Sequence, residues 1–542
     1  MSDTILRGAA ETLTSSRPDL DRKPHTLGAI AFILVLAAGL GYAAFSIAQD
    51  MRSVGEHGLA TGALVMLGLA LVIALGFEFV NGFHDTANAV ATVIYTHSLP
   101  LLTAVVWSGF CNFLGVLTSS GAVAFTVVTL LPVELILQVG SGAGYAMIFA
   151  LLLAAAIWNL GTWAMGLPNS SSHALIGSII GVGLANQLMA PAGSATSGVD
   201  WNQAIGVFKA LLFSPLIGFV LAAVLLLAMR FVIRNEALYK APEGNKPPPM
   251  AIRALLVATC TGVSFFHGSN DGQKGMGLIM LILIGAAPTA YALNRAMPDS
   301  TTPAFVEMTH RASDIFATRA GSAPKPENAA AARAVVGDAL KAREVNRPEV
   351  YAALAVLTQD IGRQVQGYGA VRLVPAAATS NVRNDMYLAS DAVRVMGAHP
   401  DGFGEEEMAT LKSLRGLLDD GTKFIPTWVK VTVALALGLG TMVGWKRIVV
   451  TVGERIGKTH LTYAQGASAE IVAMGTIGLA DVYGLPVSTT HVLSSGVAGT
   501  MVANGSGLQW STVRNLAMAW VLTLPAAMAI AGGLYVLLRQ VF

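Results

Sequence analysis

Two short, related segments of this sequence place ionisable and amide side chains within long apolar stretches. One is NGFHDTANAV at 81–90, which Glu78 precedes, and the other is HGSNDGQKGM at 267–276. An ionisable group in an apolar, membrane-like setting is costly, so its presence there indicates an ion or substrate site. The candidates that we take from these two acidic segments are Glu78, His84, Asp85, Asn88, Asn270, Asp271 and Lys274.

Hydroxyl groups dominate a second pair of segments, GLPNSSSHAL at 166–175 and GLPVSTTHVL at 484–493. Proline suits the first turn of a helix and a Ser or Thr hydroxyl suits an N-cap, so each segment predicts a short helix that begins within the apolar region. The free N–H groups and positive dipole end of such a helix suit a tetrahedral oxyanion. Two helix starts that face one point would therefore form an anion site. The candidate ligands are Ser170, Ser171, Ser172, Ser488, Thr489 and Thr490.

The carboxylates of Asp85 and Asp271 would repel an anion, so the anion requires accompanying cations. We assign Glu78, His84, Asp85 and Asp271 to this coupling ion, which is sodium, a proton or a metal ion that travels with the anion. Glu78 is either a proton-relay group or a partner for His84. For any one hydroxyl, a bond to a backbone carbonyl is an equal alternative. The histidine of each hydroxyl segment can likewise cap a helix or pair with a neighbour.

The four segments form two copies of one pattern, in which an acidic segment precedes a hydroxyl segment. Gly, Leu, Pro, Ser, His and Leu coincide between the two hydroxyl segments, and both acidic segments share G-x-x-D. His173 follows Asp85 by 88 positions whereas His491 follows Asp271 by 220, so the second copy holds 132 additional residues. The charged segment at about 290–425 accounts for them, and its Ala, Arg and Glu at helical spacing predict a soluble helical insertion.

The composition requires that most of the chain face lipid. Of its 542 residues, 54% are hydrophobic and only 12% are charged, about half the charged fraction of soluble proteins. We expect an all-α polytopic membrane protein with roughly 10–12 membrane segments. With a net charge of only +2, the chain lacks the strongly basic character that is typical of nucleic-acid-binding proteins. The predicted organisation is a polar tail (1–27), a first span and loop (28–59), repeat 1 (60–230), a basic linker (231–250) and repeat 2 (251–542) with the insertion.

Charge in the short loops predicts how the two copies are oriented. Basic residues cluster around 230–253 and again at 446–458, so both segments are expected to be cytoplasmic. The first-copy equivalent of the second segment, 119–137, contains neither Lys nor Arg, and two repeats of inverted topology predict this asymmetry. If the Asp271 segment crosses the membrane once, the insertion is periplasmic, whereas a hairpin there would reverse its side.

Glycines crowd both acidic segments and predict broken helices or re-entrant hairpins at the binding site. Gly76 and Gly82 permit a break before Asp85, and five glycines between 262 and 277 permit one near Asp271. Interruptions at corresponding positions of two halves are typical of the midplane site of a transporter.

These motifs resemble those of the inorganic phosphate transporter (Pit) family, and closely those of its bacterial low-affinity branch. The hallmark G-A-N-D-x-A-N-A reads GFHDTANA at 82–89 and, altered, GSNDGQKG at 268–275, while P-V-S-T-T-H is intact at 486–491 and reads PNSSSH at 168–173. The resemblance covers nearly all of 60–540. It implies two inverted helical repeats in the bacterial inner membrane, centrally bound phosphate, and coupling to sodium or protons. The ligands that it implies are Asp85, Asn88, Asn270, Asp271 and the hydroxyls of 170–172 and 488–490.

Two departures from the hallmarks bear on coupling. His84 replaces the first hallmark Asn, and Lys274 replaces the second Asn of the later copy. We hypothesise that the Lys274 ammonium fills the space of a sodium ion, which leaves protons, or a neutral divalent metal–phosphate complex, as the driver. The expected function is therefore a symporter that imports inorganic phosphate and is driven by protons.

Three alternatives stay open. A sodium-coupled phosphate transporter or a sulfate permease is nearest, because sulfate is also tetrahedral. An intramembrane metallohydrolase built on His84, Asp85, His173 and His491 is remote, because no H-E-x-x-H or comparable spacing occurs. We expect no enzymatic activity and no cofactor. The expected partners are phosphate, protons or sodium, a divalent metal ion with phosphate, and the lipid bilayer, and a homodimer is left open.

Overall fold

A computed structural model describes residues 18, 20, 26–55, 59–85, 87–191, 198–398 and 403–542, and for Ala87 and Asn88 it describes the backbone alone. These residues form helices and connections with no β-strand among them, which confirms the all-α expectation.

The first half contains α2 (Thr26–Ser53), α3 (Thr61–Asp85), α4 (Ala87–Tyr95), α5 (Leu101–Thr118), α6 (Ala122–Val128), α7 (Val133–Leu137), α8 (Gly142–Ala164), α9 (Ser171–Leu188) and α10 (Trp201–Val232). The second half contains α11 (Met250–Ala286), α12 (Pro288–Tyr291), α18 (Thr427–Thr441), α19 (Lys446–Val450), the π-helical turn η4 (Thr451–Arg455), α20 (Tyr463–Val482), α21 (Thr489–Ala503) and α22 (Trp510–Leu538). Between α12 and α18 lie α13 (Thr302–Ala320), α14 (Ala329–Ala342), α15 (Pro348–Tyr368), α16 (Ala376–Ala398) and α17 (Glu405–Thr422).

The long apolar helices establish a multi-pass membrane protein. Among the described residues, 7 helices are long and apolar enough to cross a bilayer, or up to 8 if α17 and α18, which are bent by 72°, form one span. The expectation of roughly 10–12 segments counted the apolar runs before and after Asp271 separately, but both lie in the single helix α11.

α11 contradicts the expectation of a break at the second acidic segment. It runs for 37 residues without interruption, straight through Asp271. Its glycines serve packing instead. A Cβ on Gly268 would lie 2.2 Å from the Asn112 carbonyl oxygen of α5, and one on Gly275 would lie 2.2 Å from the Glu78 carboxylate of α3. Small residues of this kind let membrane helices approach closely.

The first acidic segment likewise has no break at its glycines. α3 is described to Asp85 and α4 from Ala87, and Thr86 between them lies outside the described residues. The helix continues through both Gly76 and Gly82, where we expect the break. Gly82 is needed for contact with α18, because an added Cβ would lie 2.2 Å from the Leu437 carbonyl oxygen.

Helices of the first half pack against helices of the second half, and they do so in reciprocal pairs. α9 packs against α22 whereas α21 packs against α10, and α5 packs against α11 whereas α18 packs against α3. Glycines mediate these contacts: Gly181 of α9 faces the Met528 carbonyl of α22, and Gly499 of α21 faces the Phe219 carbonyl of α10. Two repeats related by a pseudo-twofold axis predict such an exchange. The inverted orientation of the two copies stays a prediction.

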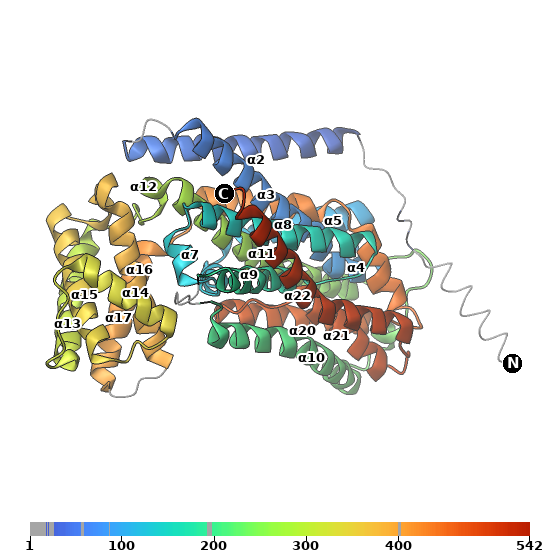
Figure 1. Cartoon of the computed structure of the whole chain (residues 1–542). Coiled ribbons are helices and arrows are strands. Elements are labelled where there is room, and N and C mark those ends of the chain that lie inside the picture. The colour runs from blue at the N-terminus through green and yellow to red at the C-terminus, as the bar shows by residue number, and fades with distance from the viewer. Residues whose placement is uncertain are drawn as a thin grey trace.

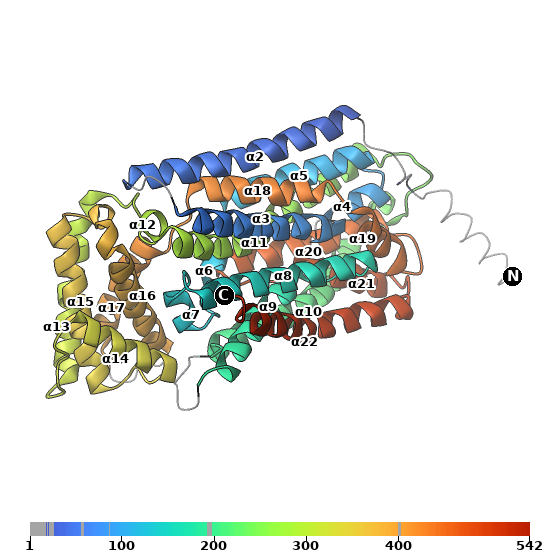
Figure 2. The ribbon, with the colours of Figure 1, turned by 45° about the horizontal axis from the view of Figure 1, so that its top comes forward.

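The helices α13 to α17 form a bundle with a hydrophobic core of its own, which includes Phe305, Leu354, Met386 and Leu411. In both views this bundle lies beyond one end of the long helices (Figures 1 and 2). The short helix α19, which carries the basic residue Arg447, lies toward the other end (Figure 2).

One charged cluster ties the bundle to the membrane helices. Asp200, the N-cap of α10, accepts a hydrogen bond from the Gln203 N–H and pairs with Arg343 at 2.7 Å and Arg394 at 3.2 Å. Partial burial acts to raise the pKa of Asp200, but the Gln203 N–H and the two guanidinium groups together hold that pKa below its usual range.

Candidate functional site

The two hydroxyl segments begin helices at the predicted positions, and the two helix starts lie together. Ser170 caps α9 by accepting from the His173 N–H at 3.1 Å, and Ser488 caps α21 by accepting from the His491 N–H at 3.2 Å. The imidazole rings of His173 and His491 have their centroids 4.7 Å apart. The prediction of two capped helix starts is confirmed, although the prolines of both segments lie two residues before the caps rather than in the first turn.

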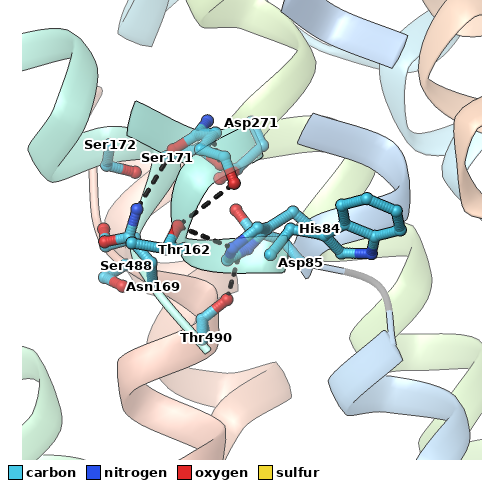
Figure 3. A network of polar contacts seen from close by, with 12 residues as sticks. His84, Asp85, Thr162, Asn169, Ser171, Ser172, Asp271, Ser488 and Thr490 are labelled. Carbon is cyan, nitrogen blue, oxygen red and sulfur yellow. Dashed lines mark hydrogen bonds and ion pairs between the residues drawn. The ribbon is translucent and has the colours of Figure 1, made fainter. Parts of the chain in front are cut away.

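Asp85 of the first half is held by α21 of the second half. Thr490 Oγ1 donates to Asp85 Oδ1 at 2.7 Å, and His84 Nδ1 lies 3.1 Å from the same oxygen. On its other side, His84 Nε2 lies 3.3 Å from Thr162 Oγ1 of α8. Figure 3 shows these side chains converging on one point from α3, α8 and α21.

Lys274 makes the matching connection from the second half to the first. Its ammonium is fully buried and donates to Asp271 Oδ1 at 2.5 Å, to Ser172 Oγ at 2.5 Å and to the Val487 carbonyl at 3.4 Å. Three acceptors satisfy the three N–H donors of an ammonium group. Lys274 therefore neutralises Asp271 and joins the starts of α9 and α21.

Three ionisable side chains at this point offer ligands for a cation. One ligand atom each from Asp85, His267 and Asp271 lies within 4.8 Å of the others. His267 Nδ1 lies 2.6 Å from Asn112 Oδ1, and Asp271 Oδ2 accepts no hydrogen bond among the described residues. Two carboxylates and an imidazole suit a divalent cation, and carboxylates alone also accept protons or sodium.

Some sequence candidates support the backbone rather than offering free groups. Asn270 uses both ends of its amide on the second hydroxyl segment, donating to the Leu485 carbonyl at 3.1 Å and accepting from the Val487 N–H at 3.4 Å. Ser171 Oγ accepts from Asn159 Nδ2 at 3.1 Å. Thr489 differs, because its buried hydroxyl has no partner among the described residues.

Glu78 and Asn88 are the remaining candidates from the first acidic segment. Glu78 is buried against Gly275 and lies 3.5 Å from Asn81 Nδ2, whereas His84 pairs with Asp85. The alternative of a Glu78–His84 pair is therefore wrong. The side chain of Asn88 lies outside the described residues.

Four residues that complete this region are not among the candidates taken from the sequence. Asn159, Thr162 and Asn169 form a hydrogen-bonded layer beneath the helix starts, with Asn169 Nδ2 donating to Asn159 Oδ1 at 3.1 Å. Asn159 and Thr162 lie in a largely apolar stretch without a distinctive spacing, whereas Asn169 belongs to the first hydroxyl segment, beside Ser170. His267 did carry a signal, because it opens the second acidic segment.

Apolar spans, two helix starts that meet in the interior, and buried carboxylates beside them define a membrane transporter. The sequence profile described as the phosphate transporter family matches residues 81–531. The chain therefore belongs to the phosphate transporter family.

Individual relatives extend this comparison over most of the chain. It is 42% identical over 503 residues to the low-affinity inorganic phosphate transporter PitA of Escherichia coli (strain K12), covering 89% of this chain and 98% of that protein. It is 41% identical over 492 residues to PitB of the same strain, covering 88% and 96%. Identity to the probable low-affinity inorganic phosphate transporter of Bacillus subtilis (strain 168) is 28% over 480 residues, covering 88% and 99%. A solved chain titled "The sodium-dependent phosphate transporter" matches with a TM-score of 0.47 and 18% identity, covering 88% of this chain and 100% of that one.

These relatives are bacterial and are named as transporters. Together with the apolar spans, they place the chain in the bacterial inner membrane as a multi-pass protein and support the expectation that it is not an enzyme.

Proposed function

We propose that this protein imports inorganic phosphate by symport with protons, and that phosphate binds where the starts of α9 and α21 meet. The observation that carries the proposal is the approach of the two capped helix starts, with His173 and His491 side by side. Their N–H groups and dipoles favour a tetrahedral anion. Phosphate is also the substrate named for the bacterial relatives.

Hydroxyls and the Lys274 ammonium supply the remaining donors. Ser172 and Thr489 lie in the first turns of the two helices, and Thr489 has a hydroxyl without a partner among the described residues. Lys274 contacts Ser172 already, so an arriving phosphate oxygen can replace that hydroxyl as acceptor. A charged hydrogen bond of this kind is stronger than a neutral one.

Charge balance supports protons as the driving ion. Lys274 occupies one side of Asp271 as a fixed cation, which reduces the need for a sodium ion there. Asp85 and His267 remain beside it and can take protons or the metal ion of a neutral metal–phosphate complex. The coupling groups of the proposal are therefore Asp85, Asp271 and His84, with Glu78 buried behind them.

The test is labelled-phosphate uptake into proteoliposomes under an imposed pH gradient, with and without sodium, with and without magnesium, and with sulfate as competitor. We expect uptake that follows the pH gradient, ignores sodium and sulfate, and is abolished by Asp271→Asn. Asp338→Asn is the matched control, because Asp338 is 70% exposed on the insertion and pairs only locally with Lys341. Sodium-dependent uptake, or inhibition by sulfate, would favour the alternative permeases instead. Stimulation by magnesium would identify the metal complex as the transported species.

A further inference from the structure

A cavity opens between α10 and α20 on the outer surface of the membrane helices. Its volume of about 610 Å³ falls within the range of about 300–1,000 Å³ that small-molecule sites span. Apolar side chains of both helices form most of its walls, among them Phe213 and Leu479. Gly206 and Gly475 make room for it, because a Cβ at either position would meet nothing within 4 Å. The cavity therefore suits a hydrocarbon chain.

Lys209 of α10 is the charged group of this cavity. Its side chain is exposed, and among the described residues no acidic side chain pairs with it. The described residues that line the cavity include neither Asp nor Glu. A cation on a membrane helix is costly without a partner, so the counter-charge for Lys209 must come from a bound molecule.

The depth of Lys209 matches the headgroup level of a bilayer. α10 has 32 residues and is about 48 Å long, so a centred helix extends about 9 Å beyond each side of a hydrocarbon core of about 30 Å. Lys209 follows Trp201, the first residue of α10, by eight positions, which is about 12 Å along the helix. A lysine side chain at that depth reaches the polar boundary by extending outward. Its ammonium group therefore lies where lipid phosphate groups lie, on the side of the bundle.

The cavity also reaches the second hydroxyl segment. Leu485 and Val487 line it, and Val487 directly precedes Ser488, the N-cap of α21. The Val487 carbonyl accepts from Ser172 Oγ at 2.7 Å and from the Lys274 ammonium at 3.4 Å. A chain in the cavity would therefore pack against the backbone that joins the two helix starts.

We propose that this cavity binds a phospholipid. Its phosphate group pairs with Lys209, and one acyl chain lies between α10 and α20 against the second hydroxyl segment. Basic residues near a membrane surface attract anionic headgroups in this way. A second copy of the chain is a poorer occupant, because a twofold interface would bring a second Lys209 to a surface that offers no acidic partner.

Lipid binding to the purified protein, followed by native mass spectrometry, tests the headgroup contact. The probes are a phosphatidylglycerol and the diacylglycerol with the same chains, which lacks the phosphate group. K209Q is expected to bind phosphatidylglycerol about fivefold more weakly than wild type and to bind diacylglycerol equally well, and Lys209→Arg is expected to bind both as wild type does. Lys240→Gln is the matched control, because Lys240 is exposed but lies outside the cavity.

A photoactivatable phosphatidylglycerol locates the acyl chain in the membrane-embedded protein. We expect it to label the parts of α10 and α20 that line the cavity, and Gly475→Leu, which fills the cavity, to abolish that labelling. Gly533→Leu is the matched control, because Gly533 of α22 is also exposed with nothing within 4 Å of an added Cβ. Neither readout involves transport, so the result is independent of the proposed symport.

Two results would overturn the inference. One is equal binding of phosphatidylglycerol by wild type, K209Q and K240Q, and the other is labelling of α10 and α20 that G475L leaves unchanged. Cross-linking of Gly475→Cys between two copies, with the cavity unlabelled by lipid, would also overturn it and would assign the cavity to a second copy of the chain.

Discussion

At the scale of residues, the pairing of Lys274 with Asp271 determines what else the site needs. Both groups are fully buried and 2.5 Å apart. Removing the ammonium leaves a buried carboxylate without its cation, which costs about 3–5 kcal/mol unless another cation replaces it. We predict that Lys274→Asn makes phosphate uptake dependent on sodium, because a sodium ion can then bind at Asp271. Uptake against sodium concentration measures this, with the half-buried Lys430, which donates to the Ser119 carbonyl, changed to Asn as control. Sodium-independent, proton-driven uptake by K274N would contradict the role given to Lys274.

Single residues also show which parts of the site the sequence can predict. Ser170 and Ser488 were predictable, because an N-cap depends on local chemistry. Thr162 was not, because its contact with His84 joins helices that are distant in sequence. Our placing of the intramembrane ionisable residues in four segments was incomplete, since the buried residue Glu470 of α20 lies outside them. A lone acidic residue in the apolar run of α20 was a sufficient signal for Glu470.

At the scale of elements, the two capped helix starts are expected to contribute alike to phosphate binding. Replacing the Ser170 or the Ser488 hydroxyl by hydrogen removes an N-cap, which costs about 1 kcal/mol of helix stability and loosens the first turn. We predict that S170A and S488A each weaken phosphate binding by about five- to tenfold. Equilibrium binding of labelled phosphate to the purified protein measures this. Ser178→Ala is the control, because that hydroxyl bonds the Ala174 carbonyl within α9. An effect at one helix start alone would contradict a shared site.

The crossing of α5 and α11 gives a second prediction at this scale. A Cβ at Gly268 would lie 2.2 Å from the Asn112 carbonyl oxygen, so G268A must push the helices apart and is expected to destabilise the protein by about 1–3 kcal/mol. Gly475 of α20 has open space beside it, and G475A is expected to be neutral or stabilising by up to about 1 kcal/mol. Denaturant unfolding of the detergent-solubilised protein compares the two. Equal stability of both variants would refute the packing role of Gly268.

The same glycines explain why the continuity of α11 could not be read from the sequence. A glycine-rich stretch is compatible with a broken helix and with a close helix crossing, and the choice depends on which backbone lies opposite. At the α5–α11 crossing, the Asn112 carbonyl oxygen lies opposite Gly268 of α11, and the Phe265 carbonyl oxygen of α11 lies opposite Gly115 of α5. In the first acidic segment, the carboxylate of Asp85 accepts a hydrogen bond from Thr490 of α21.

At the scale of the whole molecule, the course of α11 bears on the side of the insertion. α11 begins near Arg253, which donates to the Ser98 carbonyl at 2.7 Å, and leads at its other end toward the bundle. If the basic loops are cytoplasmic, a single crossing predicts a periplasmic insertion. We expect a membrane-impermeant maleimide to label Ser322→Cys in intact cells but to label Asn245→Cys only after lysis; both positions are exposed, and the native cysteines are buried. The reverse pattern would contradict this orientation.

The contact between bundle and membrane helices is expected to depend on pH. The pKa of Asp200 is held below its usual range, so its ion pairs contribute stability that is fully present above the unfolded-state pKa of about 3.9 and is lost as pH falls through the folded-state pKa. We predict that Asp200→Asn lowers the free energy of unfolding by about 2 kcal/mol at neutral pH. The difference from wild type should shrink in acid. Denaturant unfolding across pH measures this with D338N as control, and a difference that grows in acid would contradict the assignment.

The most direct test of the account is a structure determined by cryo-electron microscopy with phosphate bound. The account predicts density for a tetrahedral anion between the starts of α9 and α21, within hydrogen-bond distance of Ser172 and Thr489. Anion density elsewhere in the membrane region, with the two helix starts empty, would contradict it.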